Sequence, residues 1–406
     1  MQQQTAMKVA GAILLVAFLG LVTMVVTSPG SFLHDGPEYV KYVPLLRQHG
    51  LTEAFLDSLP GAAGPLYAFV HLAFAPLTDL RPVGMRLVNV ALLVVVAGIL
   101  AAWLRQQNCR DYLVAACSIL IVPMTWVMAG LALTEMPAMV FATLSLYLLL
   151  KGVEALEQEH PVLRWFAASG ICLAVAVWGR QPYLLLAAVP VVMALLDRRL
   201  RIAALVFAAI VATLTIPLII AWEGLVPPAD GADEGLSLLH GAISLGYAGI
   251  CFFLLVPRLQ WFFRKPFIVA AIILAALNAW YGIVVYAPVE TLASAFLSEG
   301  GMAAYSVACG SLMLVCGLTF LAWMLATTWR DRGDLKKVAI NVGLLCIVLS
   351  PAFIANFYAS RYTAMALPYL ILAAQPWRKW GWQTTTATII GCAMGLVSLQ
   401  GYYLLK

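Results

Sequence analysis

Residues 9–27 read VAGAILLVAFLGLVTMVVT, an apolar run long enough to cross a membrane as a helix. The rest of the chain continues this pattern. Of its 406 residues, 63% are hydrophobic and 11% charged, against roughly half and a quarter in soluble domains. A cleaved signal peptide is the competing interpretation of the first run, but Thr27-Ser28-Pro29-Gly30 is a poor cleavage site. The sequence therefore predicts an all-α polytopic membrane protein with a retained first helix.

Apolar runs near 20 residues give about thirteen candidate spans, from which we expect 11–13 transmembrane helices. Several are short or interrupted, notably at Pro123, Pro137, Pro190 and Pro368, where we expect broken helices. We predict a single transmembrane domain, 1–406, without a separate soluble domain. The runs lie near residues 9–27, 86–104, 112–130, 135–150, 165–179, 183–196, 202–222, 238–256, 267–286, 302–327, 338–355, 363–375 and 384–405.

Residues 28–85 form the longest stretch outside the predicted spans. Two amphipathic pieces, Glu38–His49 and Leu51–Leu59, are expected to lie as helices in the membrane interface, with leucines toward the lipid and charges toward water. Gly64-Pro65-Leu66-Tyr67 then opens another apolar run. We expect this first external loop to combine interfacial helices with the catalytic motif described below.

The basic residues separate onto one face of the predicted topology. With Lys8 inside, 17 of the 24 basic residues fall on that face, while the opposite face holds 12 of the 19 acidic residues. The positive-inside rule makes the first face, and the N-terminus, cytoplasmic. The 17 are Lys8, Arg105, Arg110, Lys151, Arg164, Arg198, Arg199, Arg201, Arg258, Arg264, Lys265, Arg330, Arg332, Lys336, Lys337, Arg378 and Lys379.

The net charge of +5 follows from this asymmetry and indicates no nucleic-acid partner. Seven of the eight cysteines lie within or beside apolar runs, and none has the spacing of a zinc site. The cysteines are therefore interpreted as small core residues.

The loop after the first span contains His34-Asp35-Gly36-Pro37-Glu38-Tyr39. A carboxylate at a sheltered water–membrane boundary can accept a proton from an attacking hydroxyl, so Asp35 and Glu38 are candidate catalytic residues. The alternative is a capping box, with Asp35 as the cap and Glu38 at the third helical position. Both interpretations stay open.

Three further charged residues reach the same predicted face. Glu135 lies between two apolar stretches, and is either a second catalytic acid or, with Thr134, a helix cap. Arg180 and Arg361 each stand alone at the end of an apolar run. Guanidinium groups bind phosphate bidentately, so we expect both to bind a lipid phosphate; the alternatives are snorkelling and pairing with Asp35 or Glu135. Candidates for sugar or acceptor binding are His34, Tyr39, Gln181, Tyr183 and Tyr362.

The order of these motifs resembles the GT-C superfamily of membrane glycosyltransferases. The matching pieces are the 34–39 loop, Gly64-Pro65-Leu66-Tyr67, Thr134-Glu135-Met136-Pro137-Ala138, Gly179-Arg180-Gln181-Pro182-Tyr183 and Ser360-Arg361-Tyr362. The Arg-Gln pair is similar to that of dolichyl-phosphate-glucose glucosyltransferases. The resemblance implies a polyprenyl-phosphate sugar donor, with Asp35 as base and both arginines on the leaving phosphate.

We therefore predict an inverting glycosyltransferase that moves a sugar from a polyprenyl-phosphate donor to an acceptor hydroxyl on the non-cytoplasmic face. The acceptor is a lipid, glycan or protein. No cofactor is required, although Mg²⁺ or Mn²⁺ stays an open alternative. The expected location is a bacterial inner membrane. The competing hypotheses are a lipid or solute transporter, including a flippase, and a polymerase or ligase of lipid-linked polysaccharide.

Overall fold

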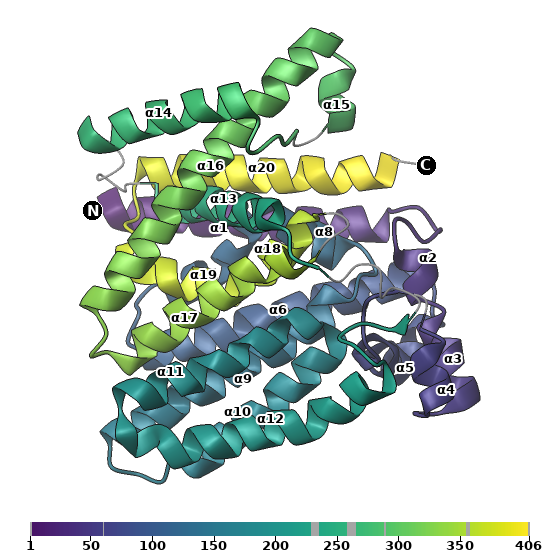
Figure 1. Cartoon of the computed structure of the whole chain (residues 1–406). Helices are drawn as coiled ribbons and strands as arrows, with labels where there is room; N and C mark the ends of the chain where they lie inside the picture. Colours follow the sequence, from purple (N-terminus) through teal and green to yellow (C-terminus); the bar gives the residue numbers. More distant parts are fainter. Residues whose placement is uncertain are drawn as a thin grey trace.

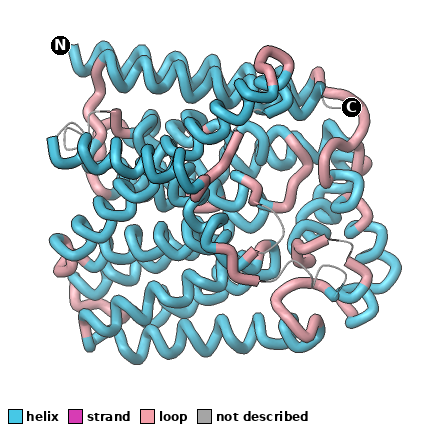
Figure 2. Tube along the Cα trace, turned by 45° about the horizontal axis from the view of Figure 1, so that its top comes forward, coloured by secondary structure: helices cyan, strands magenta, loops and turns pink. Residues whose placement is uncertain are grey.

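The computed structural model describes residues 2–59, 61–228, 235–257, 265–287, 290–354 and 358–404. Throughout these ranges the chain forms helices joined by loops, and no strand is present (Figures 1 and 2). The prediction of an all-α polytopic protein is confirmed. Arg258, Arg264 and Lys406, which the charge analysis assigned to one face or the other, lie outside the described residues.

The first part of the chain, through residue 179, contains four short helices between two long ones, followed by a broken pair and a long hairpin. The elements are α1 (Gln2–Val26), α2 (Gly36–Tyr39), α3 (Tyr42–His49), α4 (Glu53–Asp57), α5 (Leu66–Thr78), α6 (Pro82–Gln106), α7 (Tyr112–Cys117), the 3-10 helix η1 (Ser118–Ile121), α8 (Pro123–Gly130), α9 (Glu135–Glu157) and α10 (Leu163–Gly179).

The second part contains the longest helix, α16. Its elements are η2 (Gln181–Ala187), α11 (Ala188–Leu196), η3 (Arg198–Leu200), α12 (Arg201–Ala221), α13 (Leu238–Leu255), α14 (Lys265–Tyr281), α15 (Glu290–Ser294), α16 (Glu299–Arg330), α17 (Leu335–Leu349), η6 (Ser350–Phe353), α18 (Ser360–Ala364), α19 (Leu367–Ala374), η7 (Gln375–Trp377) and α20 (Trp382–Leu404).

Eight of the described helices are long and apolar enough to cross a membrane, or nine when the bent pair at 112–130 is counted as one span. The predicted number, 11–13, is larger because four predicted spans form helices too short for this test. They are 165–179, 183–196, 267–286 and 363–375, the last of which divides into α18 and α19.

Prolines explain where several helices begin. Pro123, Pro137, Pro190 and Pro368 each lie within the first three residues of a helix, where their missing N–H groups cost no helical hydrogen bond. At Pro123 this produces the expected break, because the axis turns by 82° between Tyr112–Ile121 and Pro123–Gly130. Pro137 instead lies within the first turn of an intact α9.

The bundle is held by close helix pairs, with α9 packed on α10, α10 on α12 and α13 on α16. Small residues allow the last pair to approach closely: a Cβ on Gly249 would lie 2.5 Å from the Cys316 carbonyl oxygen. Large apolar side chains face outward from several helices, such as Leu15, Val16 and Leu19 of α1. Such an apolar exterior suits lipid surroundings, and the chain is an integral membrane protein.

The segment 28–85 contains α2 to α5 at one end of the bundle, on the right of Figure 1. The two predicted amphipathic pieces correspond to α2 and α3, and to α4. Their apolar side chains Leu46, Phe55 and Leu59 are buried within the main hydrophobic core, whereas Leu51 is exposed. Much of the apolar face of this loop therefore packs on the protein itself.

Candidate functional site

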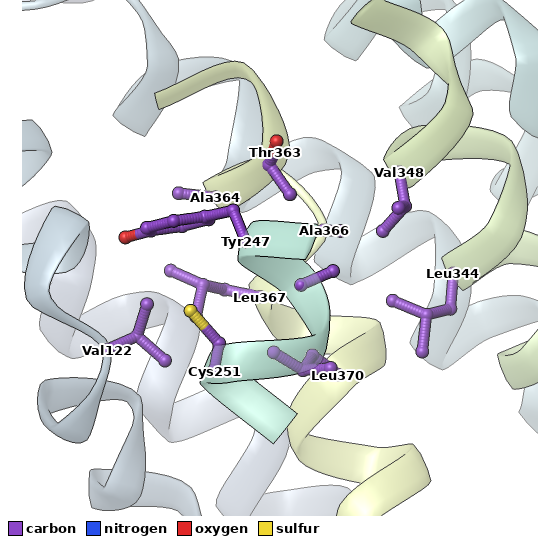
Figure 3. Close-up of a pocket in the computed structure, with 11 residues that line it drawn as sticks. Val122, Tyr247, Cys251, Leu344, Val348, Thr363, Ala364, Ala366, Leu367 and Leu370 are labelled. Atoms are coloured by element: carbon purple, nitrogen blue, oxygen red, sulfur yellow. The ribbon is translucent and has the colours of Figure 1, made fainter. Parts of the chain in front are cut away.

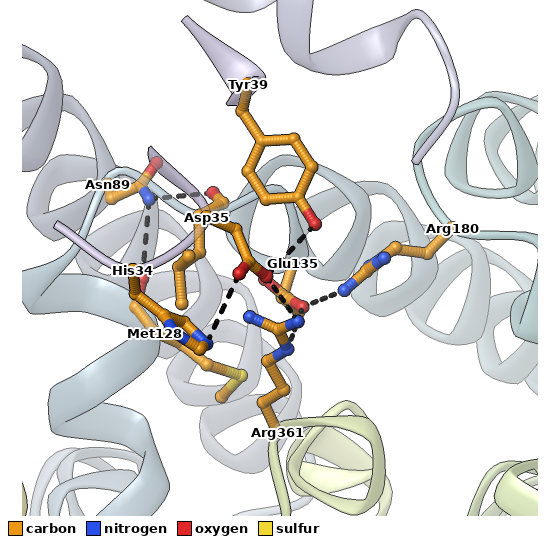
Figure 4. Close-up of polar contacts among 9 residues, drawn as sticks. His34, Asp35, Tyr39, Asn89, Met128, Glu135, Arg180 and Arg361 are labelled. Atoms are coloured by element: carbon orange, nitrogen blue, oxygen red, sulfur yellow. Dashed lines mark hydrogen bonds and ion pairs between the residues drawn. The ribbon is translucent and has the colours of Figure 1, made fainter. Parts of the chain in front are cut away.

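Four helix ends bring the predicted charged residues together. Asp35 immediately precedes α2, Glu135 is the first residue of α9, Arg180 immediately follows α10, and Arg361 lies in α18. Because α9 and α10 form a hairpin, the start of one lies beside the end of the other. Figure 4 shows the four side chains pointing toward one another from these separate segments.

The four charges alternate in one network. Nη2 of Arg361 donates a 2.6 Å hydrogen bond to Oδ2 of Asp35, and Nε of Arg361 lies 3.3 Å from Oε1 of Glu135. Nη2 of Arg180 donates to the same Oε1. Glu135 is thus shared by two guanidinium groups (Figure 4), so both arginines form the ion pairs that were expected as the alternative to phosphate binding.

This network is buried. Glu135 is inaccessible and the side chains of Arg180 and Arg361 are 4% exposed, while that of Asp35 is 28% exposed. Several of its polar atoms make no hydrogen bond to the described part of the chain: Nη1 of Arg361, Nε of Arg180 and Oε2 of Glu135. Buried polar atoms rarely stay unpaired, so these atoms are candidates to contact a bound ligand.

Asp35 faces the network rather than the backbone of its own helix. It occupies the cap position of α2, yet its side chain makes no capping hydrogen bond. The preceding His34 has a φ of 55°, uncommon for a residue other than glycine, and this turns the chain into α2. Asp35 therefore contributes a carboxylate to the site and no side-chain cap.

The environment of Asp35 keeps it ionised. Burial by itself raises its pKa, but the adjacent Arg361, helped by Arg180, lowers the pKa below the ordinary value. Nε2 of His34 lies 3.6 Å from Oδ1 of Asp35, but burial lowers the pKa of His34, which favours a neutral ring. The hydroxyl of Tyr39 is 3.5 Å from Oδ2 of Asp35, and burial raises the pKa of Tyr39.

The remaining predicted site residues take different places. Tyr362 lies beside both arginines, whose Cζ atoms are each 5.5 Å from its ring centre. Gln181 is buried, and its Nε2 has no hydrogen-bond partner in the described ranges. Tyr183 is fully buried and its hydroxyl donates to the Met365 carbonyl. Glu38 is exposed, and among the described residues its side chain makes no ion pair with Arg180 or Arg361.

The Gly64-Pro65-Leu66-Tyr67 segment docks next to the network. The amide of Gly64 donates to the carbonyl of Gly179, beside Arg180, and a Cβ at Gly64 would lie 2.2 Å from the Trp178 carbonyl oxygen. Only glycine fits this close approach. The hydroxyl of Tyr67 donates to the Ala132 carbonyl, three residues before Glu135. The 64–67 segment therefore packs against the chain next to Arg180 and also against the chain next to Glu135.

Two residues of α6, Arg86 and Asn89, were not predicted as site residues, yet they bind the chain segments that lead into the charged network. Arg86, 1% exposed, donates to the Ser28 hydroxyl at 2.6 Å and to the carbonyls of Pro29 and Ser31 at 2.8 and 2.6 Å. One turn later, Nδ2 of Asn89 donates to the carbonyls of Met128, Leu131 and Leu133 (Figure 4 shows the first). One helix therefore fixes the chain leading to Asp35 and the chain leading to Glu135. The available signal was two polar residues three apart at the start of an apolar run.

A small gap lies behind α18, between α13, α17 and α19 (Figure 3). Its volume is about 10 Å³, enough for one water molecule at most, and apolar side chains such as Val122, Leu344 and Leu367 line it. Thr363, two residues after Arg361, forms part of its wall. A sugar or a lipid does not fit there.

The described residues contain no cluster of three or more histidine, cysteine or acidic side chains arranged to bind a metal ion. The two carboxylates that face the site, Asp35 and Glu135, are each paired with a guanidinium. A divalent cation at this position would have to compete with both arginines.

No protein-family model matches the chain, and no curated protein matches it significantly in sequence. Among solved structures, the chain is similar to ArnT from Cupriavidus metallidurans bound to undecaprenyl phosphate, with 16% identity and a TM-score of 0.50. The match covers 92% of this chain and 61% of ArnT, so the chain spans about three fifths of that protein. Apo ArnT from the same organism also matches, at 15% identity, 96% and 77% coverage and a TM-score of 0.43. This likeness is one of fold, and it confirms the predicted GT-C-like helical architecture.

Proposed function

We propose that this chain is an integral-membrane inverting glycosyltransferase that moves a sugar from a polyprenyl-phosphate donor to an acceptor hydroxyl on the non-cytoplasmic face. The observation that carries the proposal is the buried network in which Arg180 and Arg361 alternate with Glu135 and Asp35. Buried ionisable groups in membrane proteins mark functional sites because their burial is costly. The GT-C-like fold supports the reaction class, and the undecaprenyl phosphate bound to ArnT supports the class of donor.

The two arginines would bind the donor phosphate. Both are held within the bundle by Glu135, which reduces the entropy lost on ligand binding. Nη1 of Arg361 and Nε of Arg180 have donor capacity left in the described structure. Glu135 would orient the two guanidinium groups toward the phosphate rather than take part in proton transfer.

Asp35 would act as the base. It takes the proton of the acceptor hydroxyl as that oxygen attacks the anomeric carbon from the side opposite the phosphate. The new glycosidic bond forms while the bond between the anomeric carbon and the phosphate oxygen breaks, and its electron pair leaves with the phosphate. Arg180 and Arg361 balance the charge that develops there. One displacement inverts the anomeric configuration.

Binding of the donor phosphate would also make Asp35 a stronger base. In the structure Arg361 donates to Asp35 and holds its pKa low, which makes Asp35 a weak base. A phosphate that engages Arg361 would loosen this pair, and the pKa of Asp35 would rise toward its ordinary value. The ion pair between Arg361 and Asp35 would thus be exchanged for an arginine–phosphate pair and a more basic carboxylate.

The neutral residues of the network would recognise the sugar and the acceptor. Tyr362 lies against both arginines and Gln181 has an unused amide, so these two would contact the donor headgroup. His34 and Tyr39 flank Asp35 and would contact the acceptor. Tyr183 would hold the segment that follows Arg180 against the segment that follows Arg361, because its hydroxyl donates to the Met365 carbonyl. Glu38 would stay outside the reacting atoms.

The reaction as proposed needs no metal ion, because two fixed guanidinium groups supply the positive charge that Mg²⁺ or Mn²⁺ would otherwise provide. Activity should therefore survive a chelator of divalent cations. Loss of activity with the chelator and recovery on adding Mg²⁺ would contradict this part of the proposal. The charge asymmetry between faces supports a cytoplasmic N-terminus and a site on the external face; the membrane we propose is a bacterial inner membrane.

The test is direct product analysis. Purified protein is incubated with short-chain polyprenyl-phosphate sugars and candidate lipid, glycan or protein acceptors, and mass spectrometry follows the lipid. Release of polyprenyl phosphate is expected, and Arg361→Ala should raise the KM for the donor more than that for the acceptor. Release of a polyprenyl pyrophosphate from a glycan-linked donor would indicate the polymerase or ligase instead. Movement of an intact lipid across a vesicle would indicate the transporter.

A further inference from the structure

A second cavity lies at the opposite end of the bundle from the charged network. Its volume is about 260 Å³, and it opens between the end of α16, the start of α17 and the α19–η7 segment. In Figure 1 the α16–α17 turn is at the left, whereas α2 is at the right. The wall is formed by Trp323, Thr327, Arg330, Asp331, Lys337, Ile340, Asn341, Leu372, Ala373, Pro376 and Trp377.

The cavity is apolar within and charged at its rim. Ile340, Leu372 and Ala373 are buried, whereas the side chains of Arg330 and Lys337 are 58% and 47% exposed. The guanidinium of Arg330 lies 5.3 Å from the ring centre of Trp377. A ligand that fits both parts has a charged group at the membrane surface and an apolar stem.

Asn341 places a polar side chain in the mostly apolar inner wall of the cavity. This residue is 6% exposed, lines the cavity, and makes no side-chain hydrogen bond to any part of the chain that the structure describes. The amide is not among the fully buried unpaired polar atoms of the described residues, so it faces the open cavity. Its donor and acceptor are therefore available to a polar group of a ligand inside the cavity.

The local charge favours an anion. Asp331 accepts bonds of 2.9 and 3.0 Å from Arg330, and Nζ of Lys337 lies 3.4 Å from both Asp331 and Asp334. These carboxylates only partly offset the basic residues, because the charged residues that line the cavity are two basic, Arg330 and Lys337, and one acidic, Asp331. A phosphate bound here would pair with the positive charge of Arg330 and Lys337 that Asp331 does not neutralise.

We propose that this cavity binds the phosphate of an anionic phospholipid. The phosphate lies between Arg330 and Lys337 within reach of the Asn341 amide, and the glycerol and first methylenes cover Ile340 and Leu372. Basic pockets between transmembrane helices at the cytoplasmic side suit such headgroups. At about 260 Å³ the cavity is large enough for a headgroup and too small for a whole lipid. The site is separate from the proposed transfer reaction and does not depend on it.

The experiment uses the full chain, purified in a neutral detergent and depleted of lipid, with the thermal unfolding midpoint as readout. Short-chain phosphatidylglycerol, short-chain phosphatidylcholine and inorganic phosphate are titrated separately. Phosphatidylglycerol should raise the midpoint with saturation, and the other two should leave it nearly unchanged at equal concentration. An equal shift with phosphatidylcholine or with inorganic phosphate overturns the proposal.

Two adjacent lysines provide a matched control. Lys337 lines the cavity, whereas Lys336 is paired with Glu157 at 2.6 Å and does not. Lys337→Gln should raise the half-saturating concentration of phosphatidylglycerol on the order of tenfold, and Lys336→Gln should leave it unchanged. Asn341→Leu, which fills the cavity and removes the amide, should also weaken binding. Equal effects of the two lysine variants, or full binding by Asn341→Leu, would contradict a built site.

Discussion

At the candidate site the side chains of Glu135, Arg180 and Arg361 are at most 4% exposed, whereas at the α16–α17 turn those of Arg330 and Lys337 are 58% and 47% exposed. Both regions contain arginine–carboxylate pairs. Exposed pairs contribute about 0–1 kcal/mol and are common where a protein meets water. Burying a network of charges costs free energy, and removing one member leaves an unpaired buried charge. Such a network in a membrane protein therefore indicates a functional site. Burial, rather than charge or pairing, distinguishes the two regions.

The largest expected effect on stability is at the centre of the buried network. Glu135→Gln leaves two buried guanidinium groups without their shared carboxylate, which should reduce the free energy of unfolding by about 3–5 kcal/mol. The control is Glu157→Gln, which breaks the Lys336 pair at the other end of the bundle, where Glu157 is 54% exposed. It should cost less than about 1 kcal/mol. Denaturant unfolding in detergent measures both, and similar losses would remove the distinction between the two regions.

A smaller effect is expected along α6. Asn89→Ala removes three hydrogen bonds to buried carbonyls before Glu135 and should cost about 1–3 kcal/mol, with a lower kcat because Glu135 loses its support. Gln106→Ala, at the other end of this helix, removes two exposed hydrogen bonds, one to Tyr147 and one from Lys151, and should change stability by less than about 0.5 kcal/mol. If Asn89→Ala kept full kcat, a positioning role for Asn89 would be excluded.

The smallest effect concerns pH. The folded-state pKa of Asp35 is lowered, so its pairing with Arg361 contributes stability above the unfolded pKa of about 3.9, and this contribution is lost as pH falls through the folded value. The difference in unfolding midpoint between the wild type and Asp35→Asn should therefore be constant from pH 7 to about 5 and shrink in more acidic buffer. A difference that instead grew with acidity would mean that Arg361 does not stabilise the ionised carboxylate.

The sequence predicted the helical class and the set of charged residues for a physical reason: lipid makes each charge in an apolar run costly and therefore visible. It did not predict how those charges pair. The bonds of Arg361 to Asp35 and of Arg180 to Glu135 join residues 326 and 45 positions apart, and periodicity contains no information about such contacts. Likewise, Glu38 and Asp35 share the i, i+3 spacing, and only the fold shows that Asp35 faces the network.

The number of membrane spans was likewise only partly predictable from the sequence. Hydropathy located every apolar segment, but it does not indicate that 183–196 begins as a 3-10 helix or that 363–375 divides into two short helices. Arg86 and Asn89 were missed because each belongs to an apolar run and their partners are backbone carbonyls, which a sequence pattern does not mark.

The central claim is that Asp35 is the base of a transfer reaction, and two substitutions in one loop test it. Asp35→Asn and Glu38→Gln each remove one carboxylate of the 34–39 loop, but only Asp35 contacts Arg361. The rate of polyprenyl phosphate release from a short-chain donor should fall about 10²–10⁴-fold in Asp35→Asn and stay near the wild-type rate in Glu38→Gln. A fully active Asp35→Asn protein, or an equal loss in both variants, would contradict the account.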